Sequence, residues 1–229
     1  QMLIDTSPKN FSDLVKISGL SHGTDVWATN TQELVLGNTE FGKIPFSEVI
    51  GCRDDIMVYL IEHGLEPKMA FDIMEYVRKG KAAKGENPAK WAKYVEAMKE
   101  KNIPEWYYWS CERIKYMFPK AHAVAYVLMA VRIAWFKVYK PILFYSAFFS
   151  IRASQFEPEV MLAGIEAIKR RIAEINAMTK TTVKDDDLLT MYQVAVEMLK
   201  RGLKFLPVDI NKSHATDFLI EGDGLWQLN

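Results

Sequence analysis

Apolar side chains recur every three or four positions along most of the chain, the spacing of one face of an α-helix. Proline or an acidic or amide side chain precedes many apolar runs, and glycine follows several of them, as at helix starts and ends. The pattern predicts helices at residues 54–63, 67–79, 89–101, 105–118, 119–139, 157–177 and 186–201, with a further helix restarting at Pro141.

The pattern changes after Gly202. Short alternating runs follow, and they surround Gly222-Asp223-Gly224, which is a hairpin signal. We therefore predict a mainly α fold with a small β-hairpin region at the C-terminus. The expected division is a helical domain at 1–202 and the start of a small β-containing segment at 203–229. A chain that stops beside a hairpin is expected to be part of a longer polypeptide.

Two apolar runs raise the question of a membrane. Residues 123–136 are interrupted by Arg132, and residues 142–151 are too short, since a membrane span needs about 20 apolar residues. We expect both runs to form buried helices of a soluble protein with no membrane partner. Core packing is the role expected for Met129, Val131, Ile133 and Phe136.

Composition narrows the class of protein. With 49% hydrophobic and 25% charged residues, the chain is an ordinary globular protein rather than a disordered tail, a collagen-like rod or a disulfide scaffold. Its 29 basic and 29 acidic residues cancel, which argues against a wholly basic nucleic-acid binder. Cys52 and Cys111 are too far apart for a CxxC zinc site and are expected to be reduced core residues of a cytoplasmic protein.

Common catalytic motifs are missing from the sequence. The four histidines lie on four separate segments without HExxH spacing, and there is no GxSxG, GxxxxGK[ST] or GxGxxG motif. The acidic run 185–187 stands at a predicted helix start, where capping explains it. The sequence therefore predicts no metal site and no hydrolase centre.

Basic residues are concentrated in one stretch. Residues 78–101 hold eight lysines and arginines against three glutamates, and the densest part is VRKGKAAKG. Cations beside small residues can approach and neutralise a phosphate. The alternative is a solvated helix end, because basic residues also favour helix C-termini.

A second candidate follows Pro119, which opens the longest predicted helix. Lys120 and His122 fall in its first turn, and Tyr126 lies one turn further on the same face. Backbone amides at a helix start can bind an anion, and an aromatic side chain can face a base. The alternative is a core helix with a hydrogen-bonded histidine.

The segment FPKAHAVAYVLMAVRIAWFKVYKPILFYSAFFSIRA resembles the fingers of bacterial C-family replicative DNA polymerases. Four further stretches agree with that family in order: ISGLSHGTDVW, EVIGCRDDIMVYLI, MEYVRKGK and PEWYYWSCERIKYMFPKAH. GLSHGTDVW together with IGCRDDI resembles the PolC type of the DNA polymerase III alpha subunit of low-GC Gram-positive bacteria. The resemblance covers essentially the whole chain.

The resemblance implies a helical fingers domain that binds the incoming dNTP and closes over the nascent base pair during template-directed nucleotidyl transfer. Two Mg²⁺ ions would be held by palm aspartates outside this chain, which is expected to bind none and to be inactive alone. Expected partners are the dNTP, primer–template DNA, the palm and other domains of the same polymerase, and the sliding clamp through the full-length protein.

The resemblance also implies roles for individual residues. Arg78, Lys79 and Lys81 match positions expected to contact the dNTP phosphates. Lys120 and His122 would line the nucleotide site, with Tyr126 shaping the pocket around the nascent pair. Ser21, His22 and Arg53 would border the same pocket. Residues 82–103 are longer than the resemblance leads us to expect and are interpreted as a surface insertion.

Two other classes of function remain open from the residues. A helical protein-interaction module would use the aromatic run Trp106, Tyr107, Tyr108 and Trp109, although a place in the core is favoured for these side chains. An independent DNA-binding module would use the lysine-rich stretch, with weak and salt-sensitive binding.

Overall fold

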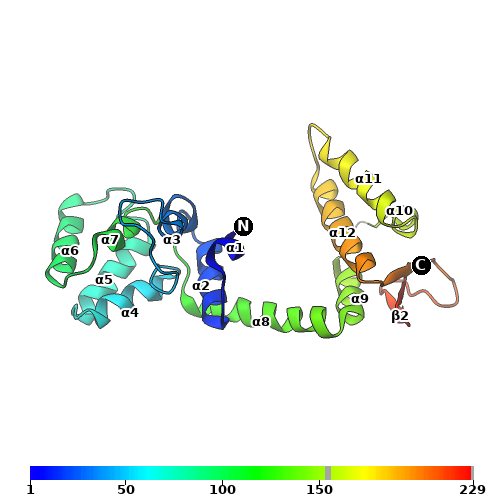
Figure 1. Cartoon of the computed structure of the whole chain (residues 1–229), viewed down its shortest axis with the longest axis horizontal. Coiled ribbons are helices and arrows are strands. Elements are labelled where there is room, and N and C mark those ends of the chain that lie inside the picture. Colours follow the sequence, from blue (N-terminus) through cyan, green and yellow to red (C-terminus); the bar gives the residue numbers. More distant parts are fainter. Residues whose placement is uncertain (153–155, 228–229) are drawn as a thin grey trace. The chain divides into compact units, whose positions relative to one another are not determined.

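The computed structural model describes residues 1–152 and 156–227, so the last two residues of the predicted segment 203–229 lie outside the described part. Backbone contacts divide the chain into two compact units, Gln1–Ala130 and Val131–Asn229 (Figure 1). The described residues form twelve α-helices, one short π-helical turn and three strands. The predicted mainly α fold with a small β region at its C-terminal end is confirmed.

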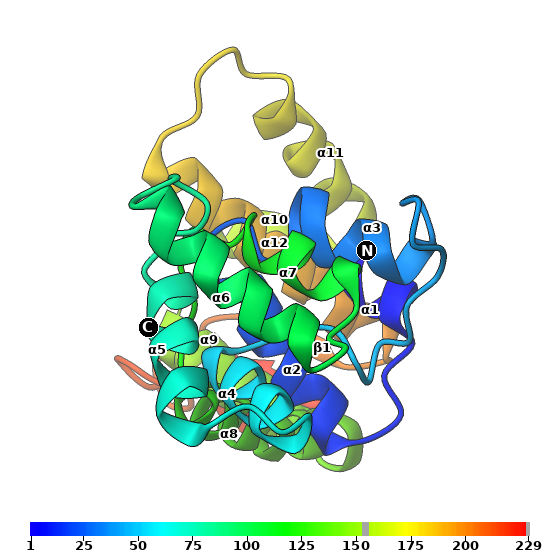
Figure 2. The same ribbon diagram turned by 90° about the vertical axis from the view of Figure 1, so that its left-hand side faces the viewer.

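Unit 1 is entirely helical in its regular structure. Its elements are α1 (Met2–Thr6), α2 (Phe11–His22), η1 (Trp27–Thr31), α3 (Gln32–Leu36), α4 (Arg53–Glu62), α5 (Pro67–Arg78), α6 (Pro88–Glu100), α7 (Glu105–Cys111) and the first half of α8 (Lys120–Tyr139). Helices α4 and α5 make the most extensive pairing among the described elements, and both are labelled in Figure 2.

Two helix starts in unit 1 follow from the predicted proline signals. The Glu66 side chain accepts hydrogen bonds from the amides of Lys68 and Met69, with Pro67 as the first residue of α5. The Asn87 side chain caps α6 by accepting from the amide of Lys90. Proline suits the first turn because its missing N–H would have no partner there.

The predicted helix 105–118 is wrong beyond Cys111, where α7 ends. The backbone beyond it bonds to a distant segment instead of continuing the helix. The amide of Thr24 donates to the carbonyl of Tyr116 at 2.9 Å, and the amide of Lys115 donates to the carbonyl of Thr24 at 3.1 Å. Tertiary hydrogen bonds therefore override the local helical pattern.

The core of unit 1 is one apolar cluster that includes Leu20, Ile56, Leu60, Ile73 and Met98. The aromatic run of α7 belongs to it: Trp106 and Tyr107 are buried, and Tyr108 and Trp109 pack partly buried against the same cluster. This confirms the favoured core role and removes the feature that supported a protein-interaction module.

Unit 2 contains the second half of α8, α9 (Pro141–Arg152), α10 (Pro158–Leu162), α11 (Ile165–Asn176) and α12 (Val183–Lys200). The predicted single helix 157–177 is two helices, because Gly164 adopts a φ of +87° between α10 and α11. Helix α12 begins three residues earlier than predicted, with Thr182 and Asp185 forming a capping box. Capping therefore explains the first member of the acidic run.

The small sheet of unit 2 has the strand order β1-β3-β2, formed by β1 (Lys204–Leu206), β2 (Leu219–Glu221) and β3 (Gly224–Trp226). Strands β2 and β3 form the predicted antiparallel hairpin, and β1 adds in parallel to β3. Phe205 and Phe218 share a core with Phe149 of α9 and Tyr192 of α12. The strands thus pack with the helices of unit 2, and a domain limit at 202–203 stays a prediction.

Helix α8 differs from the prediction. Its apolar side chains were expected to be buried, yet only Ala123 and Val127 are, and Met129, Val131, Ile133 and Phe136 are between 40% and 52% exposed. Apolar residues occur on every side of this helix, whereas the contact of Ala123 and Val127 with Val15 covers one side. The helical period was therefore predicted correctly and the burial was not.

By length and composition alone, α8 is long and apolar enough to cross a membrane, and it is the one such helix in the described part of the chain. An exposed apolar helix that packs on other protein passes the same test. Its ionic contacts favour protein surroundings, because Lys137 forms a 2.8 Å ion pair with Glu197 and Arg132 interrupts the apolar run.

Candidate functional site

Four rings lie together where α2 ends and α8 begins; we call His22, Phe118, His122 and Tyr126 the aromatic cluster. Phe118 stacks on His122 with ring centroids 5.0 Å apart and planes inclined by 19°. The Tyr126 ring lies 4.6 Å from that of His122, and the His22 ring lies 6.3 Å from both. Tyr126 is 60% exposed, so the cluster is open to solvent.

Two contacts between distant segments bring these rings together. Val15 of α2 packs on Ala123 and Val127 of α8, which fixes the start of α8 against α2. The bridge between Thr24 and Tyr116 holds the segment that enters α8 beside the end of α2. The spacing of four residues then places His122 and Tyr126 on one face.

The orientation of His22 is set by its own helix. Its Nδ1 lies 2.7 Å from the carbonyl oxygen of Ser18, and since a carbonyl oxygen only accepts, Nδ1 is the donor of this contact. Ser21 donates to the same carbonyl at 3.0 Å. Ser21 and His22, the two residues of the GLSHG motif predicted to border the site, therefore lie at the edge of the aromatic cluster.

Three cations gather around one carboxylate; we call Arg53, Arg78 and Lys79 the cation cluster. Arg78 donates to both oxygens of Glu75, from Nε at 2.5 Å and from Nη2 at 2.9 Å. Lys79 Nζ lies 3.0 Å from Glu75, and Arg53 Nη1 lies 3.7 Å from it. The hydrogen bonds from Arg78 are the main reason that the pKa of Glu75 is lowered to about 2.

The cation cluster and the aromatic cluster adjoin one another. The amide of Arg53 donates to the carbonyl of Phe118 at 3.2 Å, and the amide of Met117 donates to the carbonyl of Arg78 at 3.3 Å. The segment that carries Phe118 thus runs along both the start of α4 and the end of α5. Predicted site residues that are far apart in sequence form one surface.

The start of α8 is partly occupied by the chain's own carboxylates. Asp54 accepts from the backbone amide of Lys120 at 2.6 Å, and Asp55 lies 3.4 Å from Lys120 Nζ. Asp55 is the main cause of the raised pKa of Lys120. The first amide of this helix is therefore already bonded, and an incoming anion would meet Lys120 and the later first-turn amides.

Gly80 and Lys81 continue the surface beyond α5. Gly80 has a φ of +71°, and a Cβ there would lie 2.3 Å from the carbonyl oxygen of Lys115. Its small size is thus required by packing within the chain. Lys81 pairs with Glu86 at 3.5 Å rather than with Glu75, and it shares with Lys79 and Lys90 a hollow of about 150 Å³.

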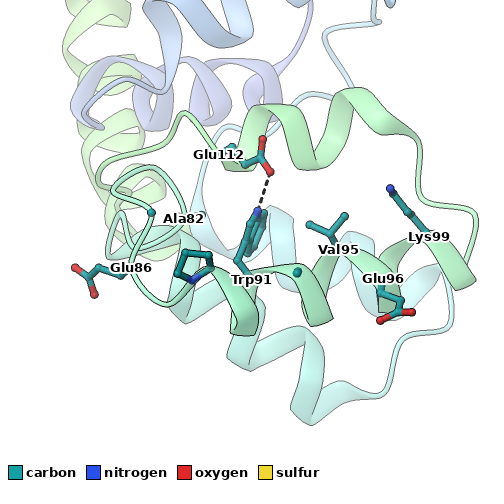
Figure 3. A pocket seen from close by; sticks show the side chains of 10 residues that line it. Ala82, Glu86, Trp91, Val95, Glu96, Lys99 and Glu112 are labelled. Carbon is teal, nitrogen blue, oxygen red and sulfur yellow. Dashed lines mark hydrogen bonds between the residues drawn. The ribbon is translucent and has the colours of Figure 1, made fainter.

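A larger groove of about 590 Å³ lies between α6 and α7, with Trp91 donating to Glu112 at 2.8 Å across it (Figure 3). None of the predicted nucleotide-site residues line this groove. Helix α6 packs on the core of unit 1 through Met98, which is fully buried, and through Tyr94 and Val95. The interpretation of residues 82–103 as a surface insertion stays a prediction.

The residues of this surface do not fit a metal ion. Within residues 1–152 and 156–227, no three His, Cys, Asp or Glu side chains lie close enough to hold one. Asp54 is bonded to the start of α8, and Asp55 accepts from the amides of Gly51 and Cys52. These carboxylates already have partners within the chain.

Sequence reasoning missed three residues of the surface: Glu75, Asp54 and Phe118. For Glu75 a signal existed, because Arg78 and Lys79 follow it by three and four positions, the spacing of helical ion pairs. The hydrogen bond that the Lys120 amide donates to Asp54 spans 66 positions and has no local signal.

The comparison with family models indicates the class of protein. Residues 1–102 match the family model of the bacterial DNA polymerase III alpha subunit finger domain. The matched part contains the cation cluster, Ser21 and His22.

Comparison of the whole chain with individual proteins gives particular relatives. The chain is 54% identical over 226 residues to the DNA polymerase III PolC-type of Oceanobacillus iheyensis, and 54% and 53% identical over the same length to those of Bacillus subtilis and Halalkalibacterium halodurans. Each alignment covers 98% of the chain and 15% of the relative. Over nearly its whole length the chain is similar to PolC-type DNA polymerase III, as its motifs predicted, and it spans about 15% of the length of these relatives.

Proposed function

We propose that this chain forms the nucleotide-facing surface of the fingers in a PolC-type DNA-directed DNA polymerase. The observation that carries the proposal is the continuity of the cation cluster with the aromatic cluster, through the bond from Arg53 to Phe118. A nucleoside triphosphate has an anionic part and a flat aromatic part, and this surface offers a matching group to each.

The cation cluster is proposed to bind the triphosphate. Arginine forms paired hydrogen bonds with phosphate oxygens, and lysine adds a mobile point charge. Arg78, Lys79 and Lys81 would compensate the charge that develops on the leaving pyrophosphate during nucleotidyl transfer. Lys120 would add a further contact from the start of α8.

The aromatic cluster is proposed to border the nascent base pair. His122 and Tyr126 present their rings from one face of α8, and His22 with Ser21 closes the border from α2. Base identity is read by pairing with the template, so this part of the surface would test shape. A correct pair would favour closure of the fingers over the active centre.

The metal-dependent chemistry is proposed to belong to the rest of the polymerase. When bound there, two Mg²⁺ ions would stabilise the attacking and leaving oxygens. This chain would bind and orient the dNTP and would be inactive alone. Primer–template DNA, the palm, the sliding clamp of the full-length protein and a cytoplasmic location are parts of the same proposal.

The exposed apolar side of α8 and α9 is proposed to lie against another domain of the same polypeptide. Unit 2 has an almost wholly apolar hollow of about 480 Å³ lined by residues that include Ile133, Phe136, Phe144 and Ile151. The relatives are several times longer than this chain, so further polymerase domains are available to cover it. Apolar surface of this extent is typical of an interface.

The test uses single-nucleotide extension by the full-length polymerase. Arg78→Ala and His122→Ala are each expected to lower kcat/KM for the dNTP at least about tenfold, with primer–template affinity nearly unchanged. Arg170→Ala on α11 is the matched control for loss of an arginine. An unchanged kcat/KM would refute the assignment, whereas an equal loss of salt-sensitive DNA affinity would favour a DNA-binding module.

A further inference from the structure

Glu75 is the residue that the cation cluster shares. We infer that Glu75 is a positioning residue that orients Arg78 and Lys79 toward the phosphates of the incoming nucleotide. The inference rests on the proposed function, because it names how the phosphate-binding side chains are held rather than a separate site.

The contact with Glu75 leaves some N–H donors of Arg78 unused. Arginine has five N–H groups, and the paired bonds from Nε and Nη2 to Glu75 use one hydrogen on each nitrogen. The other three remain for a ligand. A paired contact also fixes the plane of the guanidinium group, which a single hydrogen bond would not do.

Lys79 is held by the same carboxylate in a different way. Its Nζ lies 3.0 Å from Glu75 Oε2, and its side chain is 50% exposed. The ammonium group has three hydrogens and this contact uses one of them. Lys79 therefore keeps an exposed charge with two free donor directions while its position is restrained.

The charge balance favours anion binding. Glu75 faces three cations, since Arg53 also lies 3.7 Å from Oε1, and its lowered pKa keeps it ionised near neutral pH. Asp54 lies 3.9 Å from Arg53 and offsets part of that charge. The carboxylate reduces repulsion among the cations, and the cluster keeps a net positive charge for an anion.

Glu75 belongs to α5, a helix that packs in the core of unit 1. It lies in the last turn of α5, and its neighbours Ile73, Met74 and Val77 are buried in the core of unit 1. Arg78 and Lys79 lie at the helix end, just before the turn at Gly80. A carboxylate on a helix that is anchored in the core thus restrains two side chains at the end of that helix, as positioning groups do at binding sites.

The experiment compares Glu75→Gln with Glu166→Gln in the full-length polymerase. Glu166 of α11 pairs with Lys169 at 2.8 Å, so it matches the loss of a glutamate–lysine ion pair outside the cluster. We expect Glu75→Gln to raise KM for the dNTP about five- to tenfold, with a smaller change in kcat, and Glu166→Gln to leave both unchanged. Glu75→Asp, which keeps the charge, should restore part of the loss.

A double mutant distinguishes a positioning role of Glu75 from a general effect on the structure. If Glu75 acts through Arg78, adding Glu75→Gln to Arg78→Ala should cost little more than Arg78→Ala alone. Primer–template affinity of Glu75→Gln should match that of the parent enzyme, and the rise in KM should persist at temperatures well below the melting temperature of the variant. A rise in KM that only follows a lowered melting temperature in both Glu75 variants would overturn the inference.

The outcomes distinguish the inference from the proposed function. If Arg78→Ala has no effect on dNTP use, the proposed function fails. If Arg78→Ala impairs dNTP use and Glu75→Gln does not, only the positioning role is refuted. A lower KM in Glu75→Gln would show that the carboxylate competes with phosphate, which also overturns the inference.

Discussion

The carboxylate of Asp54 accepts a hydrogen bond from the backbone amide of Lys120 at 2.6 Å, across 66 positions of the chain. Asp54 lies in the first turn of α4, and Lys120 is the first residue of α8. One acidic side chain therefore ties together the starts of two helices that both carry residues of the candidate site. It also fixes the end of α8 from which His122 projects.

Removing this carboxylate is expected to loosen the start of α8. Because it satisfies an otherwise unbonded helix amide, Asp54→Ala should lower the free energy of unfolding by about 0.5–2 kcal/mol. Asp54→Asn keeps an acceptor and should cost less. Denaturant unfolding of the chain measures both variants, and equal losses would show that the hydrogen bond to Lys120 is not the stabilising contact.

Position 80 requires glycine for two reasons: its φ is positive, and the carbonyl of Lys115 leaves no room for a Cβ. Gly80→Ala is expected to lower the free energy of unfolding by about 2–4 kcal/mol, since φ is positive and the new Cβ would meet the carbonyl of Lys115 at 2.3 Å. Gly85→Ala is the matched control, with a φ of +66° and nothing within 4 Å of the added Cβ. Its cost should be about 1–2 kcal/mol. Equal losses for the two variants would contradict the close approach to Lys115.

The stability of the folded chain at acid pH should depend on the ion pairs of Glu75. Its pKa is about 2 in the folded chain and about 4.3 in an unfolded one, so its contribution to stability is present above about pH 4.3 and is lost as the pH falls toward 2. The stability difference between the parent chain and Glu75→Gln should be constant from about pH 6 to 9 and shrink between about pH 4 and 2. In an Arg78→Met background this acid dependence should be much smaller, and its persistence would assign it to other groups.

Both cysteines should be unreactive while the chain is folded. Cys52 and Cys111 are buried and unpaired, and burial raises both pKa values, that of Cys52 to about 12. Since the thiolate is the reactive form, a thiol reagent at pH 8 should modify neither residue in the native chain and both in denaturant. Rapid native labelling of either residue would show that this part of the core opens.

Several helix starts could be predicted because their signals are local. The prolines at 67 and 88 stand beside capping side chains, and α5 and α6 begin there. The end of α7 could not be predicted, because the competing hydrogen bonds come from Thr24, which is remote in sequence. The exposure of α8 could not be predicted either, because an apolar pattern indicates that a helix will be covered without indicating by what.

The candidate site shows the same division. Arg78 and Lys79 were recognised from a short motif, and their partner Glu75 was within reach of a spacing rule. The nearness of His22 to His122 was expected only through the family resemblance, since nothing in their local sequence links them. Asp54 had no signal of either kind.

The bridge between Thr24 and Tyr116 affects the order in which the candidate surface forms during folding. It joins the first tenth of the chain to its middle, so the ring of His22 can meet that of His122 only after α2 has docked on the remainder of unit 1. Pairing at such sequence distance is slow relative to helix formation. A shorter piece that begins after Gly23 would retain the charges of α5 yet lack the His22 side of the surface, so the complete surface would be among the last features this unit acquires as it folds.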